Sequence, residues 1–382
     1  MLAILPAMAV FAAMGLVPAL ILLALLLALR AGNVRAALGT EGPVYWITLL
    51  VLVVWALLSA LWSITPSASL SFGLRMAALM AAGALAFAAV RTPTLSARIL
   101  LPMAGGVAVC ALLLETELLP GGGLIGWAYH SMGLDFERFI DKNVNRGLCA
   151  LVLFVWPAVM SVRATRFSNL AWVLPVLVAV PVFAMESQSA QLALIVGGLG
   201  YIAVWAAPKS MPRVLAVAVP LFIAAWPVAF PVLDRTIFST PKVYAALPAT
   251  AQHRLEIWRF VSERISERPL LGWGFESARA IPGGDVVYAG ERKYLPLHPH
   301  NSALQVLLEL GIVGFTLFVA ALAAALHCWS RMAGIPAQTH AAAAAIILAY
   351  LSMGFTAFGV WQYWWLAAGW LGAVLWRLSK SS

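Results

Sequence analysis

The chain has 382 residues, of which 63% are hydrophobic and only 10% are charged. Soluble domains carry about 45–50% apolar and about 25% charged residues, so this composition excludes an ordinary soluble enzyme, a disordered protein and a secreted disulfide scaffold. The formal net charge of +9 would suggest nucleic acid in a soluble protein, but in a membrane protein its meaning depends on how the cations divide between the loops.

The first apolar segment, residues 2–29, is too long for one untilted membrane-spanning helix. It forms either one long helix or two short helices that break near Gly15-Leu16-Val17-Pro18, and we favour the broken pair. No Lys or Arg precedes the segment, and it is longer than the apolar part of a signal peptide, so we expect it to remain in the membrane.

Ten further apolar segments follow, and each is a candidate spanning helix. Together with the N-terminal pair they predict an all-α polytopic membrane protein of about 12 transmembrane helices. Their approximate ranges are 44–62, 70–90, 97–119, 147–162, 169–186, 190–206, 212–232, 303–328, 341–360 and 363–377. The three cysteines lie in apolar stretches, which indicates packing rather than a disulfide or metal framework.

The division of charge between loops predicts the orientation. By strict alternation, the short loops on one side and the C-terminal tail collect eleven Lys or Arg residues and a single acid, Glu41. The positive-inside rule makes this side cytoplasmic. The cations are Arg30, Arg35, Arg91, Arg98, Arg163, Arg166, Lys209, Arg213, Arg331, Arg377 and Lys380. The rest of the chain is nearly neutral, so the net charge does not indicate a nucleic-acid partner.

The predicted topology divides the chain into three parts. Residues 1–232 are predicted to form eight spans with short loops and a polar segment near 120–146, and residues 303–382 to form the last three spans and a cytoplasmic tail. Residues 233–302 form the large loop on the outer face. Within that loop, residues 251–268 have the apolar spacing of an amphipathic helix.

The densest polar cluster surrounds the start of the span after the large loop. A histidine can exchange a proton near neutral pH, and an acid inside an apolar span usually marks function. Gln305 and Glu309 are four residues apart and share a helical face. The plain alternative is a helix cap with two interfacial histidines. The polar members are His298, His300, Asn301, Ser302, Gln305 and Glu309.

Cations gather in three other places on the same outer face. Lys142 and Arg146 enter a span four residues apart, where cations oppose the helix dipole unless they hold an anion. Arg254 begins the amphipathic helix and could bind phosphate bidentately. Arg75 lies five residues inside its span, where it either snorkels to the interface or joins an anion pocket. A solvated charge run, with Asp141 pairing Arg146, stays open as an alternative.

The sequence carries no GxxxxGK[ST] nucleotide loop. His298 and His300 are two residues apart with a proline between them, which does not compose a zinc site. We therefore expect neither a metal nor a cofactor.

Several of these motifs resemble one family when they are read in order. They are Arg-Leu-Glu-Ile-Trp at 254–258, Pro-Leu-Leu-Gly-Trp-Gly at 269–274, and His300-Asn301 followed nine residues later by Gly311. With Asn143-Val144-Asn145-Arg146-Gly147 before a middle span, they are similar to the O-antigen ligase and O-antigen polymerase superfamily of bacterial inner-membrane proteins. Family members often carry Arg in a Ser-Arg-Ser-like outer turn, where this chain has Ser187-Gln188-Ser189.

The resemblance implies a GT-C-like, inverting, metal-independent glycosyltransferase with a periplasmic active site. Its donor would be O-antigen on undecaprenyl pyrophosphate, and its acceptor lipid A–core, within the membrane lipids. His300 would act as general base, with His298 as second candidate. Gln305, Glu309 and Asn301 would orient a histidine or the acceptor. The pyrophosphate would be held by Lys142, Arg146 and Arg254, aided by Arg75.

Other activities remain open from the sequence. An O-antigen polymerase or a protein O-glycosyltransferase of the same superfamily would share the motifs, although the late position of the large loop favours the ligase. A transporter would predict inverted repeats and helices broken near the midplane of the membrane. The polar residues of this chain cluster at one face instead.

Overall fold

The computed structural model describes residues 1–30, 42–90, 97–120 and 122–380, apart from the side chains of Arg30, Arg138, Asp141 and Lys142. The cations Arg35 and Arg91 and the acid Glu41, on which the predicted orientation partly depends, lie outside the described residues. Seven helices in the described ranges are long and apolar enough to cross a membrane. The protein is therefore an all-α polytopic membrane protein.

A helix lies in each apolar segment predicted from the sequence. The seven long helices are α4 (Pro43–Leu58), α5 (Pro66–Ala89), α6 (Leu101–Thr116), α9 (Asn145–Arg163), α11 (Gln188–Ala206), α12 (Met211–Leu233) and α15 (Ser302–Ser330). The other segments contain α1 (Leu5–Phe11), α2 (Leu16–Arg30), α10 (Val173–Ala184), α16 (Ala337–Gly354) and α17 (Tyr363–Leu378).

The N-terminal segment is broken, as favoured from its length. Ala12 leaves the helical conformation at φ −151° and ψ 62°, between α1 and α2. The helical residues before this break, Leu2–Phe11, span about 15 Å at 1.5 Å per residue, or roughly half of a bilayer's hydrocarbon thickness. This first helix alone is therefore too short to cross the membrane.

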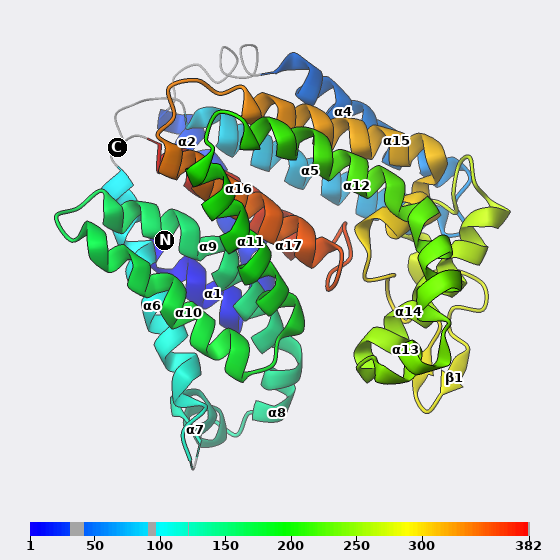
Figure 1. Cartoon of the computed structure of the whole chain (residues 1–382), viewed down its shortest axis with the longest axis horizontal. Coiled ribbons are helices and arrows are strands. Elements are labelled where there is room, and N and C mark those ends of the chain that lie inside the picture. The colour runs from blue at the N-terminus through cyan, green and yellow to red at the C-terminus, as the bar shows by residue number, and fades with distance from the viewer. Residues whose placement is uncertain (31–41, 91–96, 121, 381–382) are drawn as a thin grey trace.

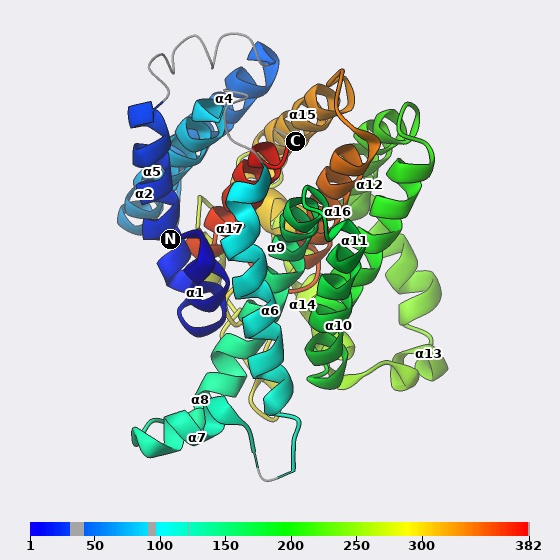
Figure 2. The same cartoon turned by 90° about the vertical axis from the view of Figure 1, so that its left-hand side faces the viewer.

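The helices form one bundle with two different ends (Figure 1). One end carries α13 (Pro241–Ala246), α14 (Ala249–Glu267) and the hairpin of β1 (Val287–Ala289) and β2 (Arg292–Lys293). The short helices α7 (Leu124–Ser131) and α8 (Phe136–Phe139) project below the same side of the bundle, as Figure 2 shows. We call this the site end. The opposite end carries the turns 164–172, 207–210 and 331–336.

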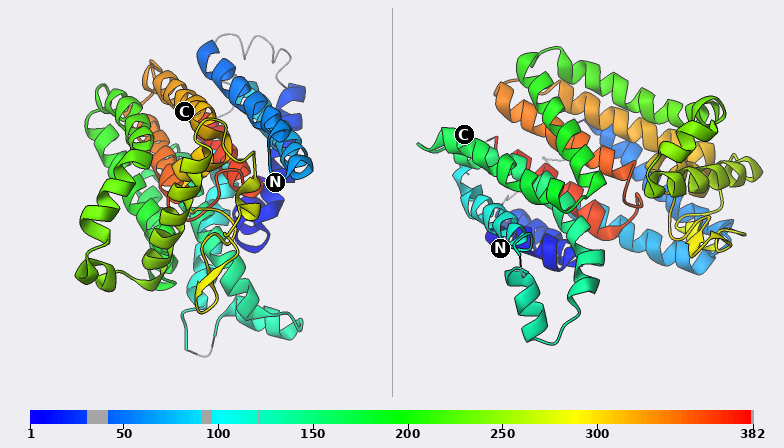
Figure 3. Two further views of the ribbon diagram at one scale, coloured as in Figure 1. Left: turned by 90° about the vertical axis from the view of Figure 1, so that its right-hand side faces the viewer. Right: turned by 60° about the horizontal axis from the view of Figure 1, so that its bottom comes forward.

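Helix α9 forms the centre of the larger core. Every residue from Gly147 to Ser161 is buried, and the stretch contains no charged side chain. Helices α1, α6, α10, α16 and α17 pack around it (Figure 2). A second cluster of buried apolar residues lies between α4, α12 and α15. Figure 3 shows the ribbons of these helices from two further sides.

Helix α15 is kinked at Gly311, where φ is 64° and ψ is −171°. The kink frees the carbonyls of Leu308 and Glu309, which accept hydrogen bonds at 3.0 and 2.8 Å from backbone N–H groups of the 269–274 loop. A Cβ at position 311 would overlap the carbonyl of Leu270. Glycine is therefore required for this loop to dock against the helix.

Helix α16 ends at Gly354 rather than near residue 360, where the apolar run predicted its end. The Ser302 hydroxyl donates a hydrogen bond of 2.6 Å to the Gly354 carbonyl, so α15 caps the end of α16. Residues 355–362 form an irregular loop that continues to α17, and we call it the 355–362 loop. Apolar composition alone cannot distinguish this buried loop from another helical turn.

Candidate functional site

The imidazole of His300 is held in one orientation and one tautomer. Its Nδ1 lies 2.6 Å from the carbonyl oxygen of Ala357 in the 355–362 loop. A carbonyl oxygen only accepts, so Nδ1 carries the proton and Nε2 keeps a lone pair. Nε2 has no hydrogen-bond partner among the described residues. His300 thus presents one free nitrogen that can accept a proton.

Burial lowers the pKa of His300 to about 4, against an opposing effect of its bond to Ala357. This value includes smaller lowering effects from the nearby charges of Arg254 and His253. At neutral pH the ring is therefore uncharged. The effect of Arg254 on the pKa of His300 indicates that the guanidinium lies close enough to the imidazole to interact with it electrostatically.

His298 differs from His300 because both of its ring nitrogens are engaged. Nδ1 accepts a hydrogen bond of 3.2 Å from the backbone N–H of His300, and Nε2 lies 3.0 Å from the side-chain amide of Gln362. The two imidazole centroids are 4.3 Å apart. His298 is only 5% exposed. Of the two histidines, only His300 offers a free nitrogen.

Arg254 is a half-buried cation that has no counter-ion among the residues the structure describes. No hydrogen bond or ion pair joins it to any other residue that the structure describes, and burial lowers its pKa. Arg259 on the same helix is different, because it contacts Asp234 at 2.7 Å and Glu256 at 2.6 Å. Arg254 is therefore available for an external anion, whereas Arg259 stabilises the fold of the large loop.

Trp258 connects α14 to the histidine segment. Its indole Nε1 donates a hydrogen bond of 2.9 Å to the carbonyl of Pro299, between the two histidines. Arg254 is four residues before Trp258 and shares its side of the helix. One helix face thus fixes the histidine backbone and presents the free cation, which gives the Arg-Leu-Glu-Ile-Trp run a physical meaning.

The other predicted anion ligands have different surroundings. The Arg146 guanidinium lies 5.9 Å from the Trp364 ring centroid, and Trp364 donates to Gln362, which also contacts His298. Lys142 belongs to the π-helix Ile140–Val144 just before α9, but its side chain is outside the described part of the molecule. Arg75 is exposed and lies 5.8 Å from the Phe72 ring centroid, and no described contact joins it to the histidines.

Asn301 is the N-cap of α15. Its Oδ1 accepts a hydrogen bond of 3.1 Å from the backbone N–H of Leu304, so the cap foreseen as the plain alternative is present. The side chain is completely buried, and its Nδ2 has no hydrogen-bond partner among the described residues. Asn301 thus fixes the start of the helix directly after His300.

Gln305 and Glu309 hold the 355–362 loop rather than a histidine. Gln305 accepts a hydrogen bond of 3.0 Å from the Val360 N–H and donates one of 3.1 Å to Glu309. The fully buried Glu309 also accepts hydrogen bonds from the Trp361 indole at 2.9 Å and from the Glu276 backbone at 2.8 Å. The 355–362 loop contains Ala357 and Gln362, the hydrogen-bond partners of His300 and His298. Gln305 and Glu309 therefore orient the histidines only indirectly, through this loop.

Glu276 is a residue that the sequence reading did not select. It has a φ of 58°. Burial raises the pKa of its carboxyl group, against a smaller opposing effect of Arg279, whose side chain is 3.9 Å away. In the described chain, the non-glycine residues with positive φ are Glu186, Glu276 and His300. Such strain gathers at functional sites.

The turn that departs from the family pattern brings no cation to the site. Ser187 donates a hydrogen bond of 2.6 Å to Asn145, and Gln188 accepts one of 3.1 Å from Thr250 at the start of α14. The turn therefore connects α9 to α14 through neutral hydrogen bonds.

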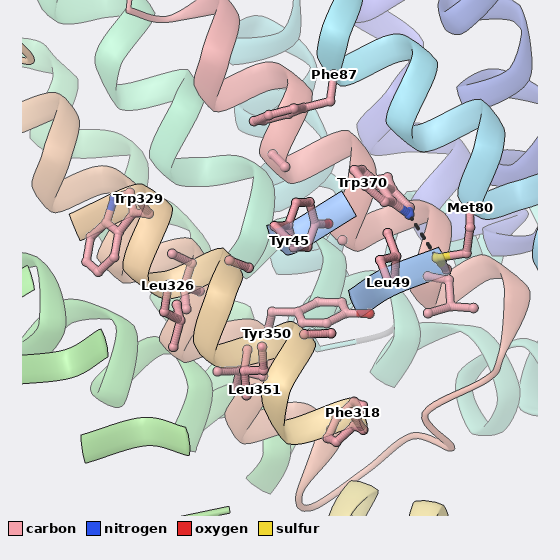
Figure 4. Close-up of a pocket in the computed structure, with 18 of the residues that line it drawn as sticks. Tyr45, Leu49, Met80, Phe87, Phe318, Leu326, Trp329, Tyr350, Leu351 and Trp370 are labelled. Carbon is pink, nitrogen blue, oxygen red and sulfur yellow. Dashed lines mark hydrogen bonds between the residues drawn. The ribbon is translucent and has the colours of Figure 1, made fainter. Parts of the chain in front are cut away.

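An apolar cavity of about 400 Å³ begins beneath the histidine segment. It lies between α4, α5, α15, α16 and α17, and Figure 4 shows Leu49, Phe318, Tyr350 and Trp370 around it. Its lining runs from Ser302 and Trp361 near the site to Trp329 and Trp376 at the opposite end.

Comparisons with known proteins agree with the motifs. Residues 173–319 match a family described as O-antigen ligase. The chain is 30% identical to a "Putative polysaccharide ligase" of Rickettsia conorii over 62% of its own length and 57% of the relative's. A protein of the same name from Rickettsia felis is 27% identical over 87% of the chain and 79% of the relative. The chain thus spans little more than half the length of the first relative and most of the second.

Proposed function

Because residues 173–319 match the O-antigen ligase family and the chain is similar to polysaccharide ligases, we propose that it moves O-antigen polysaccharide from undecaprenyl pyrophosphate to lipid A–core. The site end then faces the periplasm of a bacterial inner membrane. The described cations of the opposite end, among them Arg163, Arg166 and Arg213, favour this orientation.

The observation that carries the proposal is the Nε2 of His300 near the cation Arg254, both without a partner among the described residues. The hydroxyl oxygen of the acceptor sugar attacks the anomeric carbon of the donor, and Nε2 takes the proton of that hydroxyl. The bond from that carbon to the pyrophosphate oxygen breaks, and undecaprenyl pyrophosphate leaves. Attack opposite the leaving group inverts the anomeric configuration.

Arg254 has two effects in this mechanism. Its guanidinium offsets the negative charge that grows on the leaving pyrophosphate, with Arg146 as a second cation and Lys142 and Arg75 as further candidates. The bound anion also compensates the charge that lowers the pKa of His300. Donor binding therefore makes His300 a stronger base at the moment when the base is needed.

The apolar cavity suits the isoprenoid chain of the donor. It extends through the bundle from the residues beside His300, and its labelled lining in Figure 4 is aromatic or aliphatic. A chain that lies there would bring its pyrophosphate toward the site end. The polar groups and the cavity thus match the two chemical parts of one lipid-linked donor.

Complementation tests this function. A strain that lacks its O-antigen ligase is given the wild-type protein, Arg254→Ala, or Arg235→Ala as a control that removes an exposed cation of the same loop. At equal protein level, we expect long-chain lipopolysaccharide with wild type and the control but not with Arg254→Ala. If wild type yields only longer carrier-linked polymer, the chain is the polymerase of this superfamily, and the ligase proposal fails.

A further inference from the structure

A second cavity, of about 460 Å³, lies at the opposite end of the bundle. Helices α9, α11 and α16 and the turn before α10 surround it. None of its lining residues belongs to the histidine site. It therefore needs an explanation that is separate from glycan transfer.

Two buried donors in this cavity lack partners. Trp156 and Tyr201 are 4% and 5% exposed, and their rings stack at a centroid distance of 5.4 Å. Neither the indole Nε1 of Trp156 nor the hydroxyl of Tyr201 has a hydrogen-bond partner among the described residues. Unpaired buried polar groups are rare because they cost free energy, so this pair indicates a ligand that accepts hydrogen bonds.

Arg163 supplies a positive charge to the same cavity. Its Nε donates a hydrogen bond of 3.0 Å to the side-chain oxygen of Gln338, and its guanidinium lies 5.6 Å from the Trp172 ring centroid. The amide oxygen of Gln338 is thereby engaged, and no carboxylate lines the cavity among the described residues. The described lining offers a cation and hydrogen-bond donors, which is the chemistry that selects an anion.

The rim of the cavity lies on the exposed surface of the bundle. Ile202 and Trp205 are 59% and 54% exposed, and Trp172 is 40% exposed. Exposed tryptophans on a membrane protein are typical of the boundary between headgroups and acyl chains. A ligand that enters from this side would have an anionic group inside and apolar chains at the rim.

We propose that this cavity binds the phosphate group of an anionic phospholipid. Arg163 pairs with the phosphate oxygens, and the two orphaned donors, Trp156 and Tyr201, complete its hydrogen bonds. The acyl chains lie along Ile202 and Trp205. Basic pockets between helices at the cytoplasmic side are a known form of lipid recognition. This site is independent of the proposed glycan transfer, because it lies at the other end of the bundle.

Gly198 allows the cavity to be filled without damage to the helix. A Cβ built at this position meets nothing within 4 Å, so Gly198→Leu places its side chain in the open space. Gly105→Leu is the matched control, because it adds the same side chain to open space on α6. Arg163→Gln removes the cation, and Arg213→Gln removes an exposed cation from the same end as its control.

The test measures binding to the delipidated full chain in detergent by native mass spectrometry and by the shift of the melting temperature. The probes are dioleoyl phosphatidylglycerol, dioleoyl phosphatidylcholine and inorganic phosphate. We expect phosphatidylglycerol to bind wild type and both controls at least tenfold more tightly than Gly198→Leu and Arg163→Gln, and phosphatidylcholine to bind more weakly throughout.

The measurement with inorganic phosphate distinguishes a phospholipid headgroup from free phosphate as the ligand. No shift with phosphate alone supports a lipid whose chains contribute, and a shift that both cavity variants abolish shows that the phosphate group is sufficient. Equal binding of phosphatidylglycerol to wild type and to both cavity variants would overturn the proposal. Binding of phosphatidylcholine as tight as that of phosphatidylglycerol would also overturn it.

Discussion

His300 donates its Nδ1 proton to the carbonyl oxygen of Ala357 across 2.6 Å, although the two residues are 57 positions apart. The bond joins the end of the large loop to the loop between α16 and α17. It selects the tautomer with a free Nε2 and fixes the ring plane. The proposed base is therefore positioned by a backbone carbonyl, where many enzymes use a carboxylate.

The pH dependence of transfer should change when Arg254 is removed. His300 must be neutral to act as a base, so kcat/KM falls as the pH drops below its pKa of about 4. Because Arg254 lowers this pKa, Arg254→Gln should raise it and move the acid limb to higher pH. The profile of kcat/KM from pH 3.5 to 8 measures this, with Arg235→Gln as control. An unchanged acid limb would contradict the proximity of the two groups.

Arg254→Lys separates charge from geometry. Lysine keeps the positive charge but cannot form the bidentate contact of a guanidinium with a pyrophosphate. We expect Arg254→Lys to retain part of the activity and Arg254→Gln to lose on the order of 10²-fold in kcat/KM. Steady-state transfer at varied donor concentration gives both values. If Gln is as active as Lys, the cation does not contact the leaving group.

Glu309→Gln tests the support of the 355–362 loop. Glu309 accepts hydrogen bonds from Gln305, Trp361 and the backbone of Glu276. A glutamine would direct its own N–H₂ group at one of these donors, at a cost of about 1–3 kcal/mol. We expect a lower melting temperature and slower transfer, whereas the exposed control Glu263→Gln should change neither. Wild-type behaviour of Glu309→Gln would show that the loop is held by other contacts.

Gly311→Ala should disrupt the docking of the 269–274 loop. The substitution places a Cβ against the Leu270 carbonyl and strains a backbone at φ 64°. Strain of this kind costs about 1–3 kcal/mol before the overlap is added. The melting temperature should fall, while Gly105→Ala, which adds a Cβ to open space on α6, should leave it unchanged or slightly raised. A neutral Gly311→Ala would mean that the kink tolerates a side chain.

The sequence predicted the helices because bilayer thickness and apolar length are directly related, and it selected both histidines, Arg254 and Glu309. It did not predict that Ala357 and Gln362 are the partners of the histidines. Their segment is apolar and continuous with α16, and its loop conformation depends on contacts with Ser302 and Gln305 from another helix. Glu276 was missed for the same reason, since its significance lies in its backbone and its neighbours.

The distinction between His298 and His300 also required coordinates. Both histidines flank Pro299 in the sequence, where the resemblance made His300 the first candidate base and His298 the second. Only the hydrogen bonds reveal that His298 has both nitrogens engaged, whereas His300 has one free.

The most direct test is the transfer rate of the purified protein in proteoliposomes, with an undecaprenyl-pyrophosphate-linked glycan as donor and lipid A–core as acceptor. Loss of a general base reduces the rate by about 10²–10⁴-fold. We expect His300→Ala to show this loss while it still binds the donor with wild-type affinity. Transfer by His300→Ala at the wild-type rate would contradict the assignment of His300 as the base.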